Sequence, residues 1–527
     1  MGAGDIPPHF YGDANLPFAY HYGLHIFAAL LTRLANFYPY TAWDLARGFS
    51  IALTAVLGWL WVRRFTRSAL AGTLGSLLIT LGGGARWLLL LLPASALNWI
   101  SAGVQMSNTG LDTGANLVEA LSRPWHAEGL GDMPLPFAFL NGAFSPQSFA
   151  LGAASALPAV IVLLLLLFAK PAPSLKNPGG LALLALLLAG LALSAEHLYA
   201  MLWAGVWLAL LIAWRSARRQ KRRLQPGWIA GWAIVLLGSA LLSAVQGGYI
   251  TVTLQSWLAR LAGTAAASSY VYGFGLRWPP AVVTGHLGNL NPLDPRQLAA
   301  LLAELGPALL LAPLACRLSW RAARRQDGLT AGLGFAALLA LAFTLFVQYG
   351  LDRQSSRFAG TTLWLWLALC APLLWHLFKR GGQLLRGLLG AGFGAAILSG
   401  VVIFALQAAS ITVPRASYYL EVVDQAAVRA YWNKLPLDAH VLDNRAERSV
   451  AVFGRAAYAF TQEHAPLPQW GALVNDPTPA KVLAAGYTHL YMNNFWWNNI
   501  PAQTRQALQA ACVQAWSALE AAGGLDY

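Results

Sequence analysis

The sequence predicts a mainly α-helical protein: a polytopic transmembrane helical bundle of about ten spans, followed by a small C-terminal α/β domain outside the membrane. Three observations predict this fold class. The 527 residues are 57% hydrophobic and only 11% charged, which is too apolar for a soluble protein of this length. The apolar residues fall into long runs, and the basic residues collect between alternate runs. After residue 407 the pattern changes to short helices and strands.

The long apolar runs define the candidate spans, since a spanning helix needs about 20 mostly apolar residues. The run from Leu88 to Ile100, LLLLLPASALNWI, is expected to be a re-entrant or interfacial segment, because counting it as a span would reverse the sidedness of every later segment. The predicted spans are 44–64, 69–86, 146–169, 179–195, 198–214, 226–246, 299–318, 328–348, 359–378 and 387–407.

The basic residues indicate which side is cytoplasmic. One set of alternate connections holds most of the Lys and Arg, although its loops are the shorter ones, and cytoplasmic loops collect these residues. We therefore interpret the net charge of +14 as a sign of topology and not of a nucleic-acid partner. The cytoplasmic set is Arg63, Arg64, Arg67, Lys170, Lys176, Arg215, Arg218, Arg219, Lys221, Arg222, Arg223, Arg317, Arg321, Arg324, Arg325, Lys379, Arg380 and Arg386.

This sidedness predicts the domain organisation. Residues 1–407 form the membrane domain, with outer loops at 1–43, 87–145 and 247–298, and residues 408–527 form the outer α/β domain. The expected location is a plasma membrane of the bacterial or archaeal type, with the C-terminal domain outside and membrane lipids as partners. Because the opening loop is outside, we expect that a first helix precedes it or has been lost.

The C-terminal region alternates helices with short apolar strands. A helix ending before Leu435 and Pro436 is followed by the strand HVLD, and a helix over 479–485 that stops at Gly486 is followed by the strand THLYM. The segment PAQTRQALQAAC adds another helix. In NNFWWNN, which we interpret as strand, neighbouring side chains point to opposite faces, so one Trp is expected in the core and the other as an anchor to the membrane part of the protein.

Several kinds of site are missing from the sequence. The three cysteines, Cys316, Cys370 and Cys512, form no visible disulfide framework. We find no Gly-rich phosphate loop, no paired cysteines for zinc and no nucleophile elbow.

The opening stretch GDANLPFAYHYGLHIFAALLTRL contains the first candidate site. Asp13 precedes an amphipathic segment in which His21 and His25 lie four residues apart and so share one helical face. The alternative interpretation is that His and Tyr simply favour the membrane interface, as residues of the aromatic belts do. A metal site formed by the two histidines would need a third ligand, and none is near in sequence.

Two further candidates are the pair Glu196 and His197 and the long loop at 247–298. An ionisable residue inside an apolar stretch is costly to bury and indicates function, although this pair could also be a polar turn between two helices. It could bind an acceptor or transfer a proton. In the loop, Arg277, Trp278 and His286 could line a sugar or lipid cleft, or belong to a lid against the membrane.

The opening stretch resembles the first external loop of GT-C glycosyltransferases, in particular the protein-mannosyltransferase-like and aminoarabinose-transferase-like group. In that group an acidic loop is followed by a Pro-rich amphipathic segment and then by a helix with a basic cytoplasmic end. The counterparts here are Asp13, then LPFAYHYGLHIFAALL, then LARGFSIALTAVLGWLWVRRF. The family often has two adjacent acids, whereas Gly12 and Ala14 flank Asp13, so a second acid would come from Asp112, Glu119, Glu128 or Asp132.

A second point of resemblance lies late in the chain. Members of the group often carry an Arg-Tyr pair on the outer side of a late helix, and RQSSRFAGTTLWLWLA has Arg353, Arg357 and Phe358 there. A guanidinium at the interface can bind a lipid-linked phosphate with two hydrogen bonds. The alternative is an arginine that extends to the lipid headgroups for its own solvation.

The resemblance implies a reaction. A hexosyl or pentosyl sugar would move from a polyprenyl-phosphate donor to a lipid, glycan or protein acceptor on the outer face. Asp13 would activate the acceptor or hold a divalent cation, Mg or Mn, while Arg353 and Arg357 would hold the donor phosphate. The substrate-binding candidates also include His21, His25, Glu196, His197, Arg277 and His286. The rival function is a non-catalytic membrane protein or a transporter of envelope or lipid-linked intermediates, which should place ionisable residues in broken helices near mid-membrane.

Overall fold

The computed structural model describes a defined set of residues, most of them helical. Chain contacts divide the molecule into two compact units: unit 1 contains Met1–Ala46, Ala244–Val271 and Pro414–Tyr527, and unit 2 contains Arg47–Ser243 and Tyr272–Val413. The predicted boundary between residues 407 and 408 stays a prediction. The described residues are 8–10, 13–18, 20–106, 116–122, 135–137, 156–169, 173–220, 227–263, 274–284, 286–349, 355–410, 422–431, 434–436, 439–444, 456–458 and 470–512.

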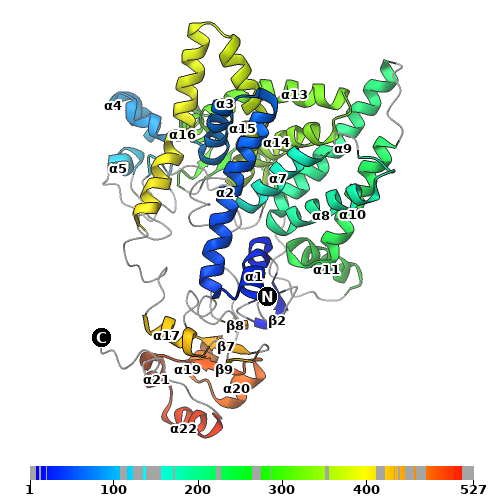
Figure 1. The fold of residues 1–527 in the computed structure, drawn as a ribbon. Coiled ribbons are helices and arrows are strands. Elements are labelled where there is room, and N and C mark those ends of the chain that lie inside the picture. The colour runs from blue at the N-terminus through cyan, green and yellow to red at the C-terminus, as the bar shows by residue number, and fades with distance from the viewer. Residues whose placement is uncertain are drawn as a thin grey trace. The chain divides into compact units, whose positions relative to one another are not determined.

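Unit 2 is a helical bundle, and each predicted span coincides with a helix or a bent helix pair (Figure 1). Helix α2 begins in unit 1 and continues into unit 2. The helices are α2 (Pro39–Thr66), α3 (Ala69–Leu81), α4 (Ala94–Ser101), α5 (Leu117–Ser122), α7 (Ala156–Phe168), α8 (Pro178–Ser194), α9 (Glu196–Arg219), α10 (Trp228–Val245), α12 (Pro295–Leu305), α13 (Ala312–Arg324), α14 (Gly328–Phe346), α15 (Ser356–Arg380) and α16 (Gln383–Ser410), with the 3-10 helices η1 (Arg86–Leu91) and η2 (Pro307–Leu311).

Among the described residues, six helices are long and apolar enough to cross a membrane: α2, α9, α10, α14, α15 and α16. Helices α12 and α13 are joined through η2 with a bend of 86°, and only the two together are long and apolar enough to cross a membrane. The described parts of α3, α7 and α8 are apolar but shorter than a full span. The Leu88–Ile100 segment forms η1 and α4, each far too short to cross a bilayer, which agrees with its interpretation as something other than a span.

Polar residues define where several of these helices begin. The side chains of Asn177, Asp294 and Asp327 accept hydrogen bonds from the first free backbone N–H groups of α8, α12 and α14. Asn177 and Asp294 are each followed by a proline, which suits the first helical position because its missing N–H has no intrahelical partner there.

Helix α15 lies at the centre of unit 2, and 78% of its most apolar stretch is buried. Thr362 donates a hydrogen bond across to Ala337 of α14, Trp364 donates to Ile79 of α3, and Trp61 of α2 donates to Ala368. Such bonds between helices satisfy polar groups that hydrocarbon cannot solvate. The neighbouring helices of α15 are therefore held by direct bonds as well as by packing.

The C-terminal part of unit 1 has a three-stranded parallel sheet. Its strand order is β8-β7-β9, with β7 at His440–Asp443, β8 at Ala456–Tyr458 and β9 at His489–Tyr491. Parallel strands need crossover connections, and the one between β8 and β9 contains the helices α19 (Trp470–Asn475) and α20 (Pro479–Ala484). Helix α17 (Val422–Tyr431) precedes β7, and α21 (Asn494–Asn499) and α22 (Ala502–Ala511) follow β9. The strands HVLD and THLYM and the helices over 479–485 and PAQTRQALQAAC are thus found where the sequence predicts them.

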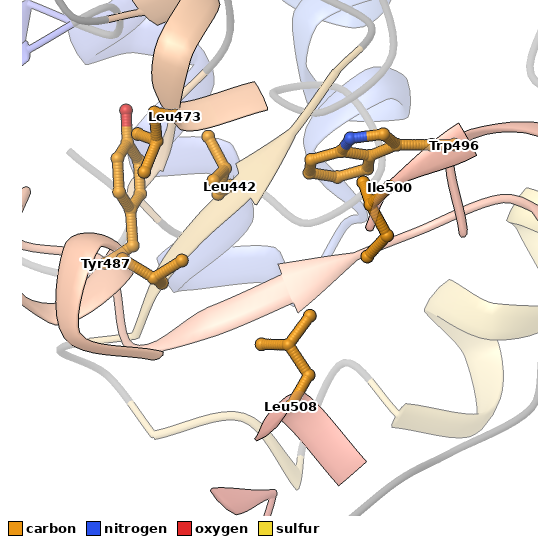
Figure 2. Packing of buried hydrophobic residues seen from close by; sticks show 7 residues of the cluster. Leu442, Leu473, Tyr487, Trp496, Ile500 and Leu508 are labelled. Carbon is orange, nitrogen blue, oxygen red and sulfur yellow. The ribbon is translucent and has the colours of Figure 1, made fainter. Parts of the chain in front are cut away.

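One hydrophobic cluster holds this sheet and its helices together (Figure 2). Trp496 is buried in it, and its indole N–H donates to Val474 over 2.7 Å. The prediction of one core Trp is thus confirmed, but the segment is helix and not strand, because the Asn493 side chain accepts from the Trp496 N–H and starts a helical turn. The cluster consists of Leu442, Leu473, Val482, Tyr487, Trp496, Ile500 and Leu508.

Unit 1 also contains the opening stretch. Strands β1 (His9–Phe10) and β2 (Asp13–Pro17) pair antiparallel, and α1 spans Gly23–Ala35. Helix α11 (Gly248–Leu261) follows α10, and the Tyr22 hydroxyl donates a hydrogen bond to the Gln246 carbonyl just before it. A helix is thus present after Asp13, but it begins at Gly23, so His25 lies in it while His21 precedes it, and the prediction that the two histidines share a helical face is wrong.

Candidate functional site

Three helix ends meet at one end of unit 2. Helix α9 begins at Glu196, directly after the one-residue break at Ala195 that ends α8. The Nε2 atom of His197 lies 3.2 Å from the Thr361 hydroxyl of α15, and its ring centroid lies 5.3 Å from that of Phe358. The Glu196–His197 pair is therefore next to the first turns of α15, the helix that carries Arg357.

A layer of short strands covers the same end of the bundle. Strands β3 (Phe274–Leu276) and β6 (Val347–Tyr349) pair antiparallel, as do β4 (Val282–Val283) and β5 (Asn289–Leu290). The Arg277 N–H donates to the Phe346 carbonyl at the end of α14, and the Val283 N–H donates to the Ser355 hydroxyl at the start of α15. Part of the loop predicted at 247–298 thus lies over the ends of α14 and α15.

The side chain of Arg277 stabilises the loop to which it belongs. Its guanidinium donates a hydrogen bond to the Ala281 carbonyl over 3.1 Å, which closes the turn between β3 and β4. The side chain is half-buried.

The strongest electrostatic feature of this end is a buried ion pair. Arg86, at the start of η1, makes two hydrogen bonds of 2.7 Å to the carboxylate of Glu304 near the end of α12, and both side chains are 0% exposed. Arg86 also donates to the Leu135 carbonyl over 2.8 Å. Two parallel bonds to a carboxylate are the geometry that a guanidinium favours, and they compensate part of the cost of burying both charges.

His286, in the β4–β5 hairpin, extends this polar cluster. Its Nδ1 atom lies 3.5 Å from the guanidinium of Arg86. Burial of the imidazole, with the positive charge of Arg86 beside it, lowers the pKa of His286 to about 3. The ring is therefore neutral at physiological pH and presents Nδ1 to Arg86 as an acceptor.

The ion pair lies where two interrupted helices meet. The chain leaves α3 through Gly82, Gly83 and Gly84 before η1, and it leaves α12 through Gly306 before η2. The Ala85 N–H donates to the Ala303 carbonyl over 2.8 Å, which joins the two interruptions. Gly306 has a φ of 70°, and a Cβ atom there would lie 2.9 Å from the Gly83 oxygen. Glycine is thus needed both for the backbone angle and for the close approach.

The remaining candidates are in unit 1. The His25 ring lies 4.5 Å from Trp43 and 6.1 Å from Phe18, and the His21 ring lies 3.7 Å from Tyr20, as ring centroid distances. Burial, together with the charge of His21, lowers the pKa of His25 to about 3. Both histidines thus belong to an aromatic cluster. Asp13 is the first residue of β2.

The structure brings four predicted residues together and leaves others aside. His197, Arg277, His286 and the helical turn with Arg357 share one end of unit 2. Arg353, Asp112, Glu128 and Asp132 lie outside the described residues, and Glu119 is exposed on α5. Within the described residues, no group of three or more His, Cys, Asp or Glu side chains is placed to hold a metal ion.

Arg86 and Glu304 were missed as site residues by the sequence interpretation. A signal existed, because Glu304 is the single acidic residue within the predicted span 299–318. Arg86 is the last residue of the predicted span 69–86 and had no role assigned to it. Nothing in the local sequence indicates that the two are partners, because 218 positions separate them.

The opposite end of the bundle is basic. Helices α9, α13 and α15 end with Arg218 and Arg219, with Arg321 and Arg324, and with Lys379 and Arg380. The apolar helices together with this clustering define an integral membrane protein of the polytopic helical class. Comparison with known proteins finds no family model and no curated protein that matches this sequence.

Proposed function

We propose that the protein is a membrane glycosyltransferase of GT-C type that transfers a sugar from a polyprenyl-phosphate donor to an acceptor on the outer face. The resemblance of the opening stretch and of the Arg353–Phe358 segment to that family suggests the reaction. The observation that supports it most is the grouping of His197, Arg277, His286 and the first turn of α15 at the end of unit 2 opposite the basic helix ends.

In this proposal the residues of unit 2 bind the donor. The N-terminal end of α15, a 25-residue helix, carries the positive end of the helix dipole, which favours a phosphate. Arg357, in the first turn, would add a guanidinium, and Arg353 a second one. The ring nitrogens of His197 and His286 would form hydrogen bonds with sugar hydroxyls. Asp13 would deprotonate the acceptor or hold Mg or Mn, as the resemblance implies.

The test is sugar transfer by the purified protein in lipid vesicles, offered a panel of polyprenyl-phosphate hexoses and pentoses. Arg357→Gln is expected to reduce turnover at least 100-fold, and Asp13→Asn to abolish it, because each removes a charge that acts on the reacting groups. The matched control is Arg386→Gln, an exposed arginine at the basic end, which should retain full turnover. Full turnover by Arg357→Gln would overturn the proposed role, and no transfer by the unmodified protein from any donor would overturn the reaction.

A second candidate function is supported by the interrupted helices. Transporters commonly place ionisable residues where membrane helices are broken. Arg86 lies just after the break that ends α3, and Glu304 lies just before the break that ends α12. A carrier of lipid-linked intermediates would move a fluorescent lipid analogue across vesicles without any sugar transfer. If movement persists in Glu304→Gln, this candidate fails.

A further inference from the structure

Strand β3 and the turn after it expose an unusual row of large apolar side chains. Phe274 is 63% exposed, Leu276 is 91% exposed and Trp278 is 78% exposed. Phe274 and Leu276 are two residues apart in β3, so their side chains leave the backbone on the same side, and Trp278 follows in the turn after the strand. A row of three such residues in five positions is costly in contact with water, which indicates an interaction surface.

The row is fixed to the end of a membrane helix. The Phe274 ring centroid lies 5.9 Å from that of Phe343 in α14, and the Trp278 ring stacks on Phe346 at 6.5 Å with an angle of 11° between the planes. Phe343 and Phe346 are one turn apart on α14. Since Phe346 is the last residue of α14, the row lies against the final turn of that helix.

The length of α14 indicates the depth of the row in a bilayer. At a rise of 1.5 Å per residue its 19 residues span about 28 Å, close to the roughly 30 Å of the hydrocarbon core. Its last residue is therefore near the edge of that core. Leu276 pairs with Val347, the next residue of the chain, and paired strands are about 5 Å apart. The headgroup layer on each side is roughly 5 to 7 Å thick, so Leu276 falls within it.

The polar groups of this segment are arranged so that they do not oppose insertion. The Arg277 backbone N–H donates to the Phe346 carbonyl, and its guanidinium donates to the Ala281 carbonyl. Pairing with β6 satisfies backbone groups of β3. Aromatic residues with a polar atom, such as Trp278, favour the headgroup level, where the indole N–H stays hydrated.

We infer that Phe274, Leu276 and Trp278 form a lipid-contact surface that lies in the headgroup layer of the membrane beside the end of α14. The partner is the lipid bilayer itself. This surface adjoins the candidate site, because the rings of Phe343 and Phe358, 4.4 Å apart, lie between Phe274 and His197. The inference depends on the membrane location of α14 and not on the proposed sugar transfer.

The test is a nitroxide spin label at Leu276→Cys in a cysteine-free protein reconstituted in phosphatidylcholine vesicles. Leu276 is almost fully exposed, so the label should leave the fold intact. We expect collisions with lipid-soluble oxygen to exceed those with a water-soluble nickel complex. The matched control is Asn289→Cys, an exposed position of β5 in the same loop layer, where the nickel complex should dominate.

Equal access of the nickel complex at the two positions would overturn the inference, because the row would then face water. A label at Leu276→Cys shielded from both reagents would also overturn it, since a protein partner would then cover the surface. A second measurement needs no substitution: a photoreactive group at the headgroup end of a vesicle lipid should modify residues 274–278 and not residues 289–293. Failure of that labelling contradicts the inference equally.

Discussion

The pair of Arg86 and Glu304 shows how one residue can depend on another more than 200 positions away. Each side chain alone would be an uncompensated charge with no access to water. Together they share two short hydrogen bonds, and Arg86 uses a further donor on the Leu135 carbonyl. The contact therefore affects the free energy of unfolding mainly because loss of one partner would leave the other charge buried without compensation.

We predict that Glu304→Gln destabilises the protein by about 3–5 kcal/mol, because the buried guanidinium of Arg86 then lacks its counter-charge. The measurement is the thermal unfolding midpoint of the protein in detergent, followed by retention of the folded peak in gel filtration. The double variant Arg86→Met with Glu304→Met is expected to be more stable than Glu304→Gln, since neither charge is left buried.

The control for this prediction is Arg296→Gln, which breaks a pair with Asp294 on the same helix α12. The side chains of that pair are 41% and 25% exposed, so water screens the interaction and the midpoint should hardly change. A Glu304→Gln protein as stable as this control would show that the buried pair adds nothing.

His286 gives a prediction about pH. The imidazole binds a proton near pH 6.5 in the unfolded chain but only at about pH 3 in the folded protein. Between these values the unfolded state holds one more proton, so stability is complete above pH 6.5 and falls as the pH drops, by about 1.4 kcal/mol per pH unit. We predict that His286→Asn loses less stability than the unmodified protein between pH 7 and pH 5.

Thermal midpoints at several pH values measure this difference. The control is His376→Asn, which removes an exposed imidazole near the basic end of α15. If His286→Asn and His376→Asn follow the same pH profile, His286 does not remain neutral in the folded state.

At the scale of elements, the interruption of the helical chain at Gly306 depends on glycine for its positive φ and for its close approach to Gly83. We predict that Gly306→Ala destabilises the protein by more than about 1 kcal/mol, because alanine resists a positive φ and its Cβ would press on Gly83, Gly84 and Ala85. The same thermal assay measures the loss.

The matched substitution is Gly390→Ala in α16, where nothing lies within 4 Å of the added methyl group. Alanine is the better helix former, so this variant should be as stable as the unmodified protein or more stable. Equal midpoints for Gly306→Ala and Gly390→Ala would mean that the close approach of Gly306 to Gly83 is not needed for stability.

The elements also show what the sequence can and cannot predict. The described helices overlap all ten predicted apolar runs, because apolar length and caps such as Asp327 are local signals, but among them only six helices and one bent pair are long enough to cross a membrane. The 86° bend at Gly306 was not predicted, although Gly306 and Pro307 form a pair that commonly ends a helix. The helix at Asn494–Asn499 was missed because a single side-chain cap outweighed the strand preference of its aromatic residues.

The same limit applies to the candidate site. The sequence singled out His197, Arg277 and His286 one at a time, from their residue type and place in the chain. Their common location follows from long-range bonds such as that of Val283 to Ser355, which no sequence pattern encodes. Arg86, whose charge lies beside His286, is 200 positions away in the sequence, so no local pattern could indicate this contact either.

At the scale of the whole molecule, function depends on which side of the membrane each end of the bundle faces. The short turn Arg325–Asp327 between α13 and α14 places the basic end of α13 beside the start of α14. The end of α14 is joined through residues 347–355 to the start of α15. The basic ends of α9, α13 and α15 are thus opposite His197 and His286, and the positive-inside rule assigns the basic end to the cytoplasm.

We predict that a membrane-impermeant maleimide labels Asn289→Cys in intact cells and labels Gln220→Cys only after the membrane is permeabilised. Gln220 directly follows the basic end of α9, whereas Asn289 belongs to the loop layer at the opposite end. The native thiol of Cys512 is exposed, so the protein with Cys512 as its single cysteine reports the side of the C-terminal sheet, and we expect labelling from outside. Labelling of Gln220→Cys in intact cells would place His197, His286 and Arg357 in the cytoplasm, and a transfer reaction on the outer face could then not use them.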